Sequence, residues 1–83
     1  MPDPDYLTLR GRLAQAQEEL RDAEARVTNA VDAVRRQILM YSDPEDIAIG
    51  SVRAAVADLA GERDKWIALR DEISKIKSRL GMP

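Results

Sequence analysis

Residues 6–41 read YLTLRGRLAQAQEELRDAEARVTNAVDAVRRQILMY, and apolar side chains recur along them with a period of seven. Two interleaved sets of positions carry this repeat, alternately three and four residues apart. The first set is Tyr6, Leu13, Leu20, Val27, Val34 and Tyr41, and the second is Leu9, Ala16, Ala23, Ala30 and Gln37. A spacing of this kind, kept over five heptads with Gln37 as its polar exception, is typical of a coiled-coil helix.

The same period returns in the second half of the chain. Its positions are Val52, Leu59, Trp66, Ile73 and Leu80, with the companion set Ala55, Glu62, Leu69 and Ile76. Between the two repeats, Asp43-Pro44 is typical of a capping acid before a proline at the first helical position. Gly50-Ser51 indicates a second break, after which Ser51 is able to cap the next helix. Gly81 follows the last repeat residue, as a helix-ending glycine does.

These features predict an all-α fold, an antiparallel two-helix hairpin that is coiled-coil-like and forms one domain over residues 1–83. We expect helices over about 4–41 and 51–80. The connection at 42–50 is short, and the sequence leaves open whether it is a loop, a helical turn starting at Pro44 or a β-hairpin. An isolated pair of helices of this size is marginally stable without a disulfide or a metal, so we expect oligomerisation or a partner to complete the fold.

Two registers of the hairpin are possible, one heptad apart, and charges beside the repeat positions favour one of them. In the favoured register Val27 layers with Leu69 and the hairpin centre falls near Ala48. Its facing charges attract: Glu24 with Arg70, Glu19 with Arg79, and Arg26 with Glu72. The facing charges of the other register repel: Glu19 with Glu72, Arg12 with Arg79, and Arg26 with Lys65. Each exposed pair is worth only about 0.2–1 kcal/mol, but three sign changes favour the first register.

Composition excludes several classes of function. The 83 residues contain no cysteine and no histidine, so Ser-His-Asp and Cys-His nucleophiles and Glu-x-x-His metal pairs are impossible. The four glycines stand far apart, which rules out a Gly-rich phosphate loop. We therefore predict no catalytic residues, no cofactor, no metal and no small-molecule substrate. The 13 basic and 15 acidic residues give a net charge of −2, which makes nucleic acid an unlikely partner.

Apolar residues outside the repeat gather around the connection, where a single hairpin has no second layer to cover them. They are Val31, Ile38, Leu39, Met40, Ile47, Ile49 and Val56. Exposed apolar clusters of this kind mark contact surfaces, so we predict protein interaction or self-association there. The alternative is that the connection folds back and covers these side chains itself.

Two residues of the second repeat have both a structural and a functional interpretation. Trp66 is expected to pack opposite Ala30 in the seam, the line of repeat positions along which the two helices meet. A tryptophan can also anchor an interface with another protein. Glu62 at a seam position is expected to reach solvent at a weak layer. A register-determining polar residue or a partner contact are the other interpretations.

Two families resemble parts of this chain. Ser42-Asp43-Pro44 between two helices resembles the turn of the needle subunits of type III secretion systems, which are small helical hairpins. Their apolar, assembly-buried tail has no counterpart at Ser78–Pro83. The order of Leu9–Ala16, a short connection and Val52–Leu59 is similar to small head-completion or head–tail connector proteins of tailed phages. In some of those the connection is a β-hairpin, here at 37–41 and 47–51, although their first helix is shorter. Both resemblances imply a subunit of a larger assembly.

The sequence therefore predicts a non-enzymatic structural protein that acts by protein–protein interaction, such as a phage virion connector. The alternatives are a small adaptor, chaperone or inhibitor with one protein partner, and a nucleic-acid-binding hairpin. The longest apolar run, Ile38–Tyr41, is far shorter than the roughly 18–20 residues that cross a membrane. Met1–Pro4 has no basic or apolar region typical of a secretory signal. We expect a cytoplasmic protein or a component of an assembly built in the cytoplasm.

Overall fold

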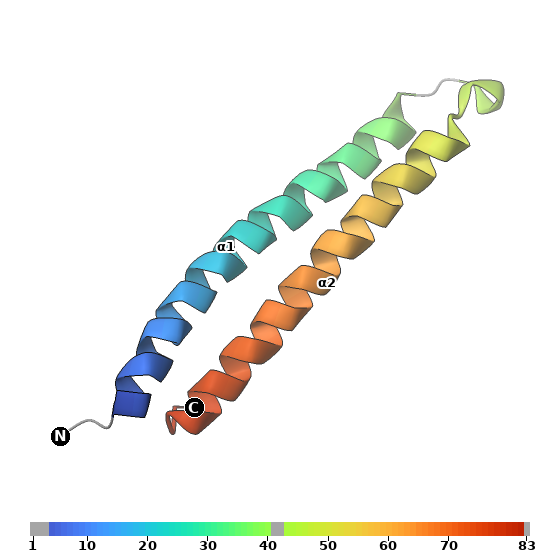
Figure 1. Cartoon of the computed structure of the whole chain (residues 1–83). Coiled ribbons are helices and arrows are strands. Elements are labelled where there is room, and N and C mark those ends of the chain that lie inside the picture. The colour runs from blue at the N-terminus through green and yellow to red at the C-terminus, as the bar shows by residue number, and fades with distance from the viewer. Residues whose placement is uncertain (1–3, 41–42, 83) are drawn as a thin grey trace.

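Two long helices lie side by side in the computed structural model, which describes residues 4–40 and 43–82 (Figure 1). Helix α1 spans Pro4–Leu39, the 3-10 turn η1 spans Pro44–Asp46, and helix α2 spans Ile49–Arg79. The start of α1 and the end of α2 lie together at the end opposite the connection, so the helices are antiparallel (Figure 1). The molecule is a rod of 67 × 18 × 14 Å. The predicted all-α helical hairpin is confirmed.

The connection contains a short helical turn, which was one of the three predicted possibilities. The backbone N–H of Asp46 donates to the carbonyl of Asp43 at 3.0 Å, and that of Ile47 donates to Pro44 at 3.4 Å. The β-hairpin alternative at 37–41 and 47–51 does not hold among the described residues, because 37–39 belong to α1 and 49–51 belong to α2; Tyr41 lies outside the described residues. Asp43 stands before the turn, but its side chain makes no capping hydrogen bond.

Helix α2 begins before the predicted break at Gly50-Ser51. Both residues lie inside the helix, and Ala48 occupies the N-cap position without a side-chain capping bond. The first backbone bond there is from the N–H of Val52 to the carbonyl of Ala48, at 3.0 Å. The prediction that Ser51 caps α2 is therefore wrong, and the continuous helix places Ile49 in the same seven-residue pattern as the rest of α2.

Gly81 ends α2 as predicted, in the left-handed conformation with φ of 73°. The N–H of Met82 donates to the carbonyl of Lys77 at 2.8 Å, and that of Gly81 donates to Ser78 at 3.1 Å. This pair of bonds is the Schellman arrangement, which pairs helix carbonyls that would otherwise lack a partner. A side chain at position 81 would clash with its own backbone in this conformation.

We expect Gly81→Ala to lower the free energy of unfolding by about 1 kcal/mol, because alanine is strained at positive φ. Gly11→Ala is the matched control, since Gly11 lies inside α1 with open space around the position of an added Cβ. That substitution should raise the free energy of unfolding by about 0.5–1 kcal/mol, because alanine is the better helix former. Urea titration followed by circular dichroism measures both values. Equal effects of the two variants would contradict the positive-φ cap.

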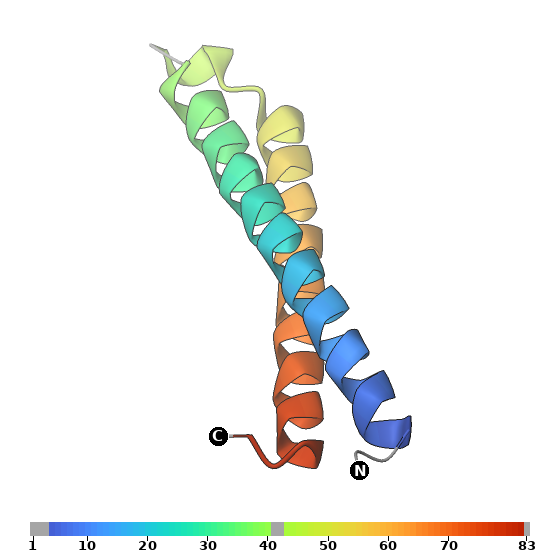
Figure 2. The same ribbon diagram turned by 90° about the vertical axis from the view of Figure 1, so that its left-hand side faces the viewer.

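The predicted repeat positions form the contact between the helices. Among the described residues, each of them except Tyr6 is at least partly buried. The buried side chains are Leu13, Ala16, Ala23, Ile73 and Ile76. Four of them form one cluster in the half of the hairpin far from the connection, with Leu9, Leu20 and Leu80 packed against it, and the fifth, Ala23, lies near the middle of α1. The two helices cross at a shallow angle along their length (Figure 2).

The register of the two helices differs from the predicted one. Arg12 contacts Glu72 at 2.6 Å, whereas the predicted register sets Glu72 opposite Arg26, which lies 14 residues or about 21 Å further along α1. Ala16 shares a cluster with Ile73, as it does when the hairpin centre lies at Pro44–Glu45 and not near Ala48. The structure therefore has the register in which facing charges were expected to repel.

Burial of leucine side chains explains this outcome. In the predicted register Leu9 and Leu13 would lie beyond the end of α2, whereas here Leu13 is 5% exposed and Leu9 packs against the core. Burying a leucine contributes about 1.5–3 kcal/mol, and each exposed ion pair only about 0.2–1 kcal/mol. Pro44 acts in the same direction, since a helix cannot continue through it and the turn must centre there.

Candidate protein-interaction surface

The apolar residues around the connection are exposed in the structure. Relative exposure is 58% for Ile38, 80% for Leu39 and 74% for Met40. The other predicted surface residues that are exposed are Ile47, Ile49 and Val56, and Val31 is half-buried. The described part of the connection, residues 43–48, therefore does not fold back to cover these side chains, and they are available for contact.

Four of these residues form a continuous strip, which we call the apolar ridge: Val31, Ile38, Ile49 and Val56. Val31 and Ile38 each come directly after a seam residue of α1. On α2, Val56 comes directly after a seam residue, and Ile49 lies one heptad before Val56. In the observed register Ile38 is level with Ile49, and Val31 with Val56, on the same flank of the hairpin. The next positions along this flank are Glu24 and Arg63, where the ridge ends.

The opposite flank of the same half is hollow. An open groove of about 780 Å³ runs between α1 and α2, and we call it the alanine groove. Small residues dominate its lining: Ala30, Ala33, Ala54, Ala55, Ala57 and Gly61. Gln37 and Ser51 line its end near the connection, and the charged side chains of Arg26, Glu62 and Lys65 line the other end. This groove was not predicted from the sequence, although the small residues beside the seam were a signal for it.

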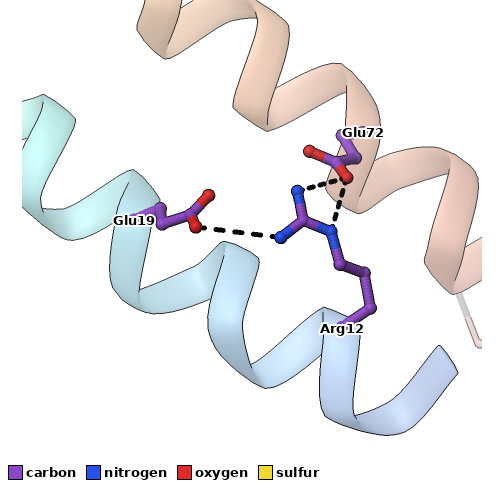
Figure 3. A network of polar contacts seen from close by, with 3 residues as sticks. All are labelled: Arg12, Glu19 and Glu72. Atoms are coloured by element: carbon purple, nitrogen blue, oxygen red, sulfur yellow. Dashed lines mark hydrogen bonds and ion pairs between the residues drawn. The ribbon is translucent and has the colours of Figure 1, made fainter. Parts of the chain in front are cut away.

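Two charge networks replace the facing repulsions of this register. The first is centred on Arg12, which lies between Glu19 and Glu72 (Figure 3). Its Nε and Nη2 donate to Oε1 of Glu72 at 2.7 and 2.6 Å, and Nη1 lies 3.7 Å from Oε1 of Glu19. The two carboxylates that face each other across the hairpin thus share one guanidinium.

Glu62 centres the second network. Its Oε2 accepts a hydrogen bond from Nε of Arg26 at 3.0 Å, and its Oε1 lies 3.7 Å from Nζ of Lys65. The side chain of Glu62 is 24% exposed, so its carboxylate still reaches solvent, as predicted, while it pairs with both cations. The carboxylate of Glu62 lies between the facing cations Arg26 and Lys65, whose repulsion would otherwise oppose this register. A polar residue in the seam can specify the register of two helices in this way.

The hydrogen bond to Glu72 raises the pKa of Arg12 above its ordinary value, with a smaller contribution from the charge of Glu19. A raised pKa of a base contributes stability that is lost only as pH rises through that pKa. Arginine is already protonated throughout the accessible range, so the network gives no pH dependence near neutrality. Its role is structural, because the pair of Arg12 with Glu72 joins α1 to α2.

Trp66 lies half-buried in the seam, as predicted for core packing, although its layer partner is Ala23 and not Ala30. The guanidinium of Arg70 covers its ring, with the Arg70 Cζ 5.2 Å from the ring centroid. This cation–π contact occupies the arginine that was expected to face Glu24. The tryptophan is therefore shielded on one side by its own helix.

Within the described residues, no group of three or more acidic side chains lies close enough to hold a metal ion. Neither of the long helices has a stretch that is apolar enough to cross a membrane. Searches of protein-family models, curated proteins and solved structures gave no match to this chain.

Proposed function

We propose that this protein is a non-enzymatic structural subunit that works by protein–protein interaction through the connection end of the hairpin. The observation that carries the proposal is the exposure of Ile38, Leu39, Met40 and Ile49 at one end of a rod whose buried core is at the other. Large apolar side chains gathered on one surface of a small protein are typical of a contact site.

The total exposed area supports the same proposal. A compact monomer of 9.3 kDa exposes about 5,000 Å² by the usual scaling with mass, whereas this chain exposes 6324 Å². A standard interface buries about 800 Å² on each partner, so the excess of roughly 1,300 Å² on this one chain is more than one such contact covers and a little less than two would cover. Contacts on more than one surface would therefore bring the chain to the burial expected of a stable fold.

The kind of assembly follows from the chemistry and the resemblances together. The chain lacks His and Cys, so a contact role is favoured over catalysis, and its net charge of −2 favours a protein partner over nucleic acid. A virion connector of a tailed phage is the specific assembly that we propose. The helix order supports it, whereas the helical turn at Pro44–Asp46 is unlike the β-hairpin of some members.

We expect Ile38→Asp to remove the chain from its native complex while leaving the hairpin folded, because a buried aspartate at an interface costs several kcal/mol. Size fractionation of extracts from the host that encodes the chain measures this, with an epitope tag for detection. The wild type should migrate far above its 9.3 kDa mass, and the variant should migrate as the free chain.

Leu7→Asp is the matched control, since Leu7 is 59% exposed and Ile38 is 58% exposed, but Leu7 lies at the other end of the rod. This control should migrate with the wild type. Retention of Ile38→Asp in the large complex would refute the connection end as the contact site. A one-to-one complex with a single protein would favour an adaptor or inhibitor over an assembly subunit.

A further inference from the structure

We infer that the partner at this surface is a second copy of the same chain, whose apolar ridge docks in the alanine groove of its neighbour. The inference rests on the proposed function and names the occupant of the contact site. Ridge and groove occupy the same half of the hairpin but opposite flanks. Each ridge residue comes directly after a seam position in the sequence, whereas the groove residues Ala33 and Asp58 each come directly before one. One molecule therefore presents both halves of a contact at once.

The two surfaces are complementary in size. Six of the 13 residues that line the groove of about 780 Å³ are alanines or glycine, which are too small to fill it, and the other seven are polar or charged. Ile38, Ile49 and Val56 of the ridge are 58%, 53% and 47% exposed, so about half of the surface of each is open. Large side chains of one surface packing against small ones of another reach the density of a protein interior. A groove placed against another groove would bring only small residues together.

Charges at the end of each surface agree with the same arrangement. When two copies stack in the same orientation, Glu24 beyond the ridge of one comes within about two residues' rise, or roughly 3 Å along the axis, of Arg26 and Lys65 of the other. By the same count, Arg63 beyond the ridge of one copy comes within one residue of Glu62 and within two residues of Lys65 of the other, so it meets charges of both signs. The side chains that meet are therefore mixed in sign, and no cluster of like charge opposes docking.

The area is sufficient for a stable contact. A standard interface buries about 800 Å² on each partner, and each interior copy would use two surfaces, which together account for the excess exposed area of roughly 1,300 Å². Because the two surfaces differ, the contact is heterologous and repeats from copy to copy. A heterologous contact produces a ring when the rotation closes and an open stack when it does not.

Analytical ultracentrifugation of the purified chain and two variants tests this arrangement. Ile38→Asp disables the ridge, and Ala54→Arg fills the groove at an exposed helical position where arginine is a good helix former. The wild type should associate further as concentration rises, and each variant alone should remain monomeric, with at least tenfold weaker association. An equimolar mixture should form a heterodimer of twice the 9.3 kDa chain mass and nothing larger, because one intact ridge meets one intact groove.

Leu7→Asp and Ala60→Arg are the matched controls, being exposed positions outside both surfaces, and they should associate as the wild type does. Circular dichroism confirms that each variant is folded. A groove variant that still dimerises by itself would overturn the inference in favour of a ridge-to-ridge pair. A wild-type chain that is monomeric up to about 100 µM, well above the µM limit for standard interfaces, would also overturn it. In that case a large native complex that Ile38→Asp disrupts would leave the proposed function intact, with a different protein as partner.

Discussion

A cysteine pair introduced as Ala16→Cys with Ile73→Cys should form an intramolecular disulfide in nearly every folded molecule, whereas Ala23→Cys with Ile73→Cys should form none. Ala16 and Ile73 belong to one buried cluster. Ala23 lies seven residues further along α1, or about 10 Å, and a disulfide requires Cα atoms about 4.4–6.8 Å apart. The first pair reports the observed register, and the second reports the register that facing charges favoured.

The chain has no native cysteine, so each double variant has only the introduced thiols. Oxidation at low protein concentration, followed by mass spectrometry and titration of free thiols, measures the fraction that is cross-linked. Each cysteine variant with a single substitution controls for disulfides between molecules. Efficient cross-linking of the Ala23 pair would show that α2 is displaced by one heptad, and the charge networks around Arg12 and Glu62 would then be wrong as well.

Ile76→Ala should unfold the hairpin under conditions in which the wild type is folded. Ile76 is 6% exposed and packs in the cluster with Leu13, Ala16 and Ile73. Truncating a buried isoleucine costs about 2–5 kcal/mol. A domain of this size has a total stability of roughly 5 kcal/mol or less, so this one change removes a large part of it.

Ile38→Ala is the matched control for the isolated chain, since Ile38 is 58% exposed and lies outside the core. It should change the free energy of unfolding by about 0.5 kcal/mol or less, as surface substitutions usually do. Thermal and urea unfolding followed by circular dichroism measures both variants at a protein concentration at which the wild type is monomeric. A similar loss of stability for both would mean that the core is not confined to the half far from the connection.

The seam was predictable from the sequence because helical geometry is local. A side chain that recurs every three or four residues lies on one face of a helix whatever surrounds it, so Leu13, Ile73 and Ile76 could be placed in the contact in advance. The end of α2 was predictable for the same reason, since Gly81 acts on its own backbone. The exposed residues around the connection were predictable as well, because a hairpin has no second layer to cover them.

The alanine groove was not identified from the sequence. Its walls come from both helices, and its depth depends on which small residue lies opposite which, so it exists only once the register is known. Trp66 shows the same dependence. Its place in the seam was foreseen, but its neighbour across the seam changed with the register, and Arg70 of its own helix shields its ring.

The sequence by itself determined that two amphipathic helices pair, which of their faces meet, and which apolar side chains are left outside the pair. Only the tertiary structure decided how far one helix slides along the other. Counting charges two at a time favoured the wrong register, because the long side chain of Arg12 reaches past its opposite neighbour to join Glu19 and Glu72. The networks of three charges and the burial of Leu9 and Leu13 each depend on residues that are far apart in the sequence and meet only in this register. A local pattern in the chain therefore does not show which register has the lower free energy.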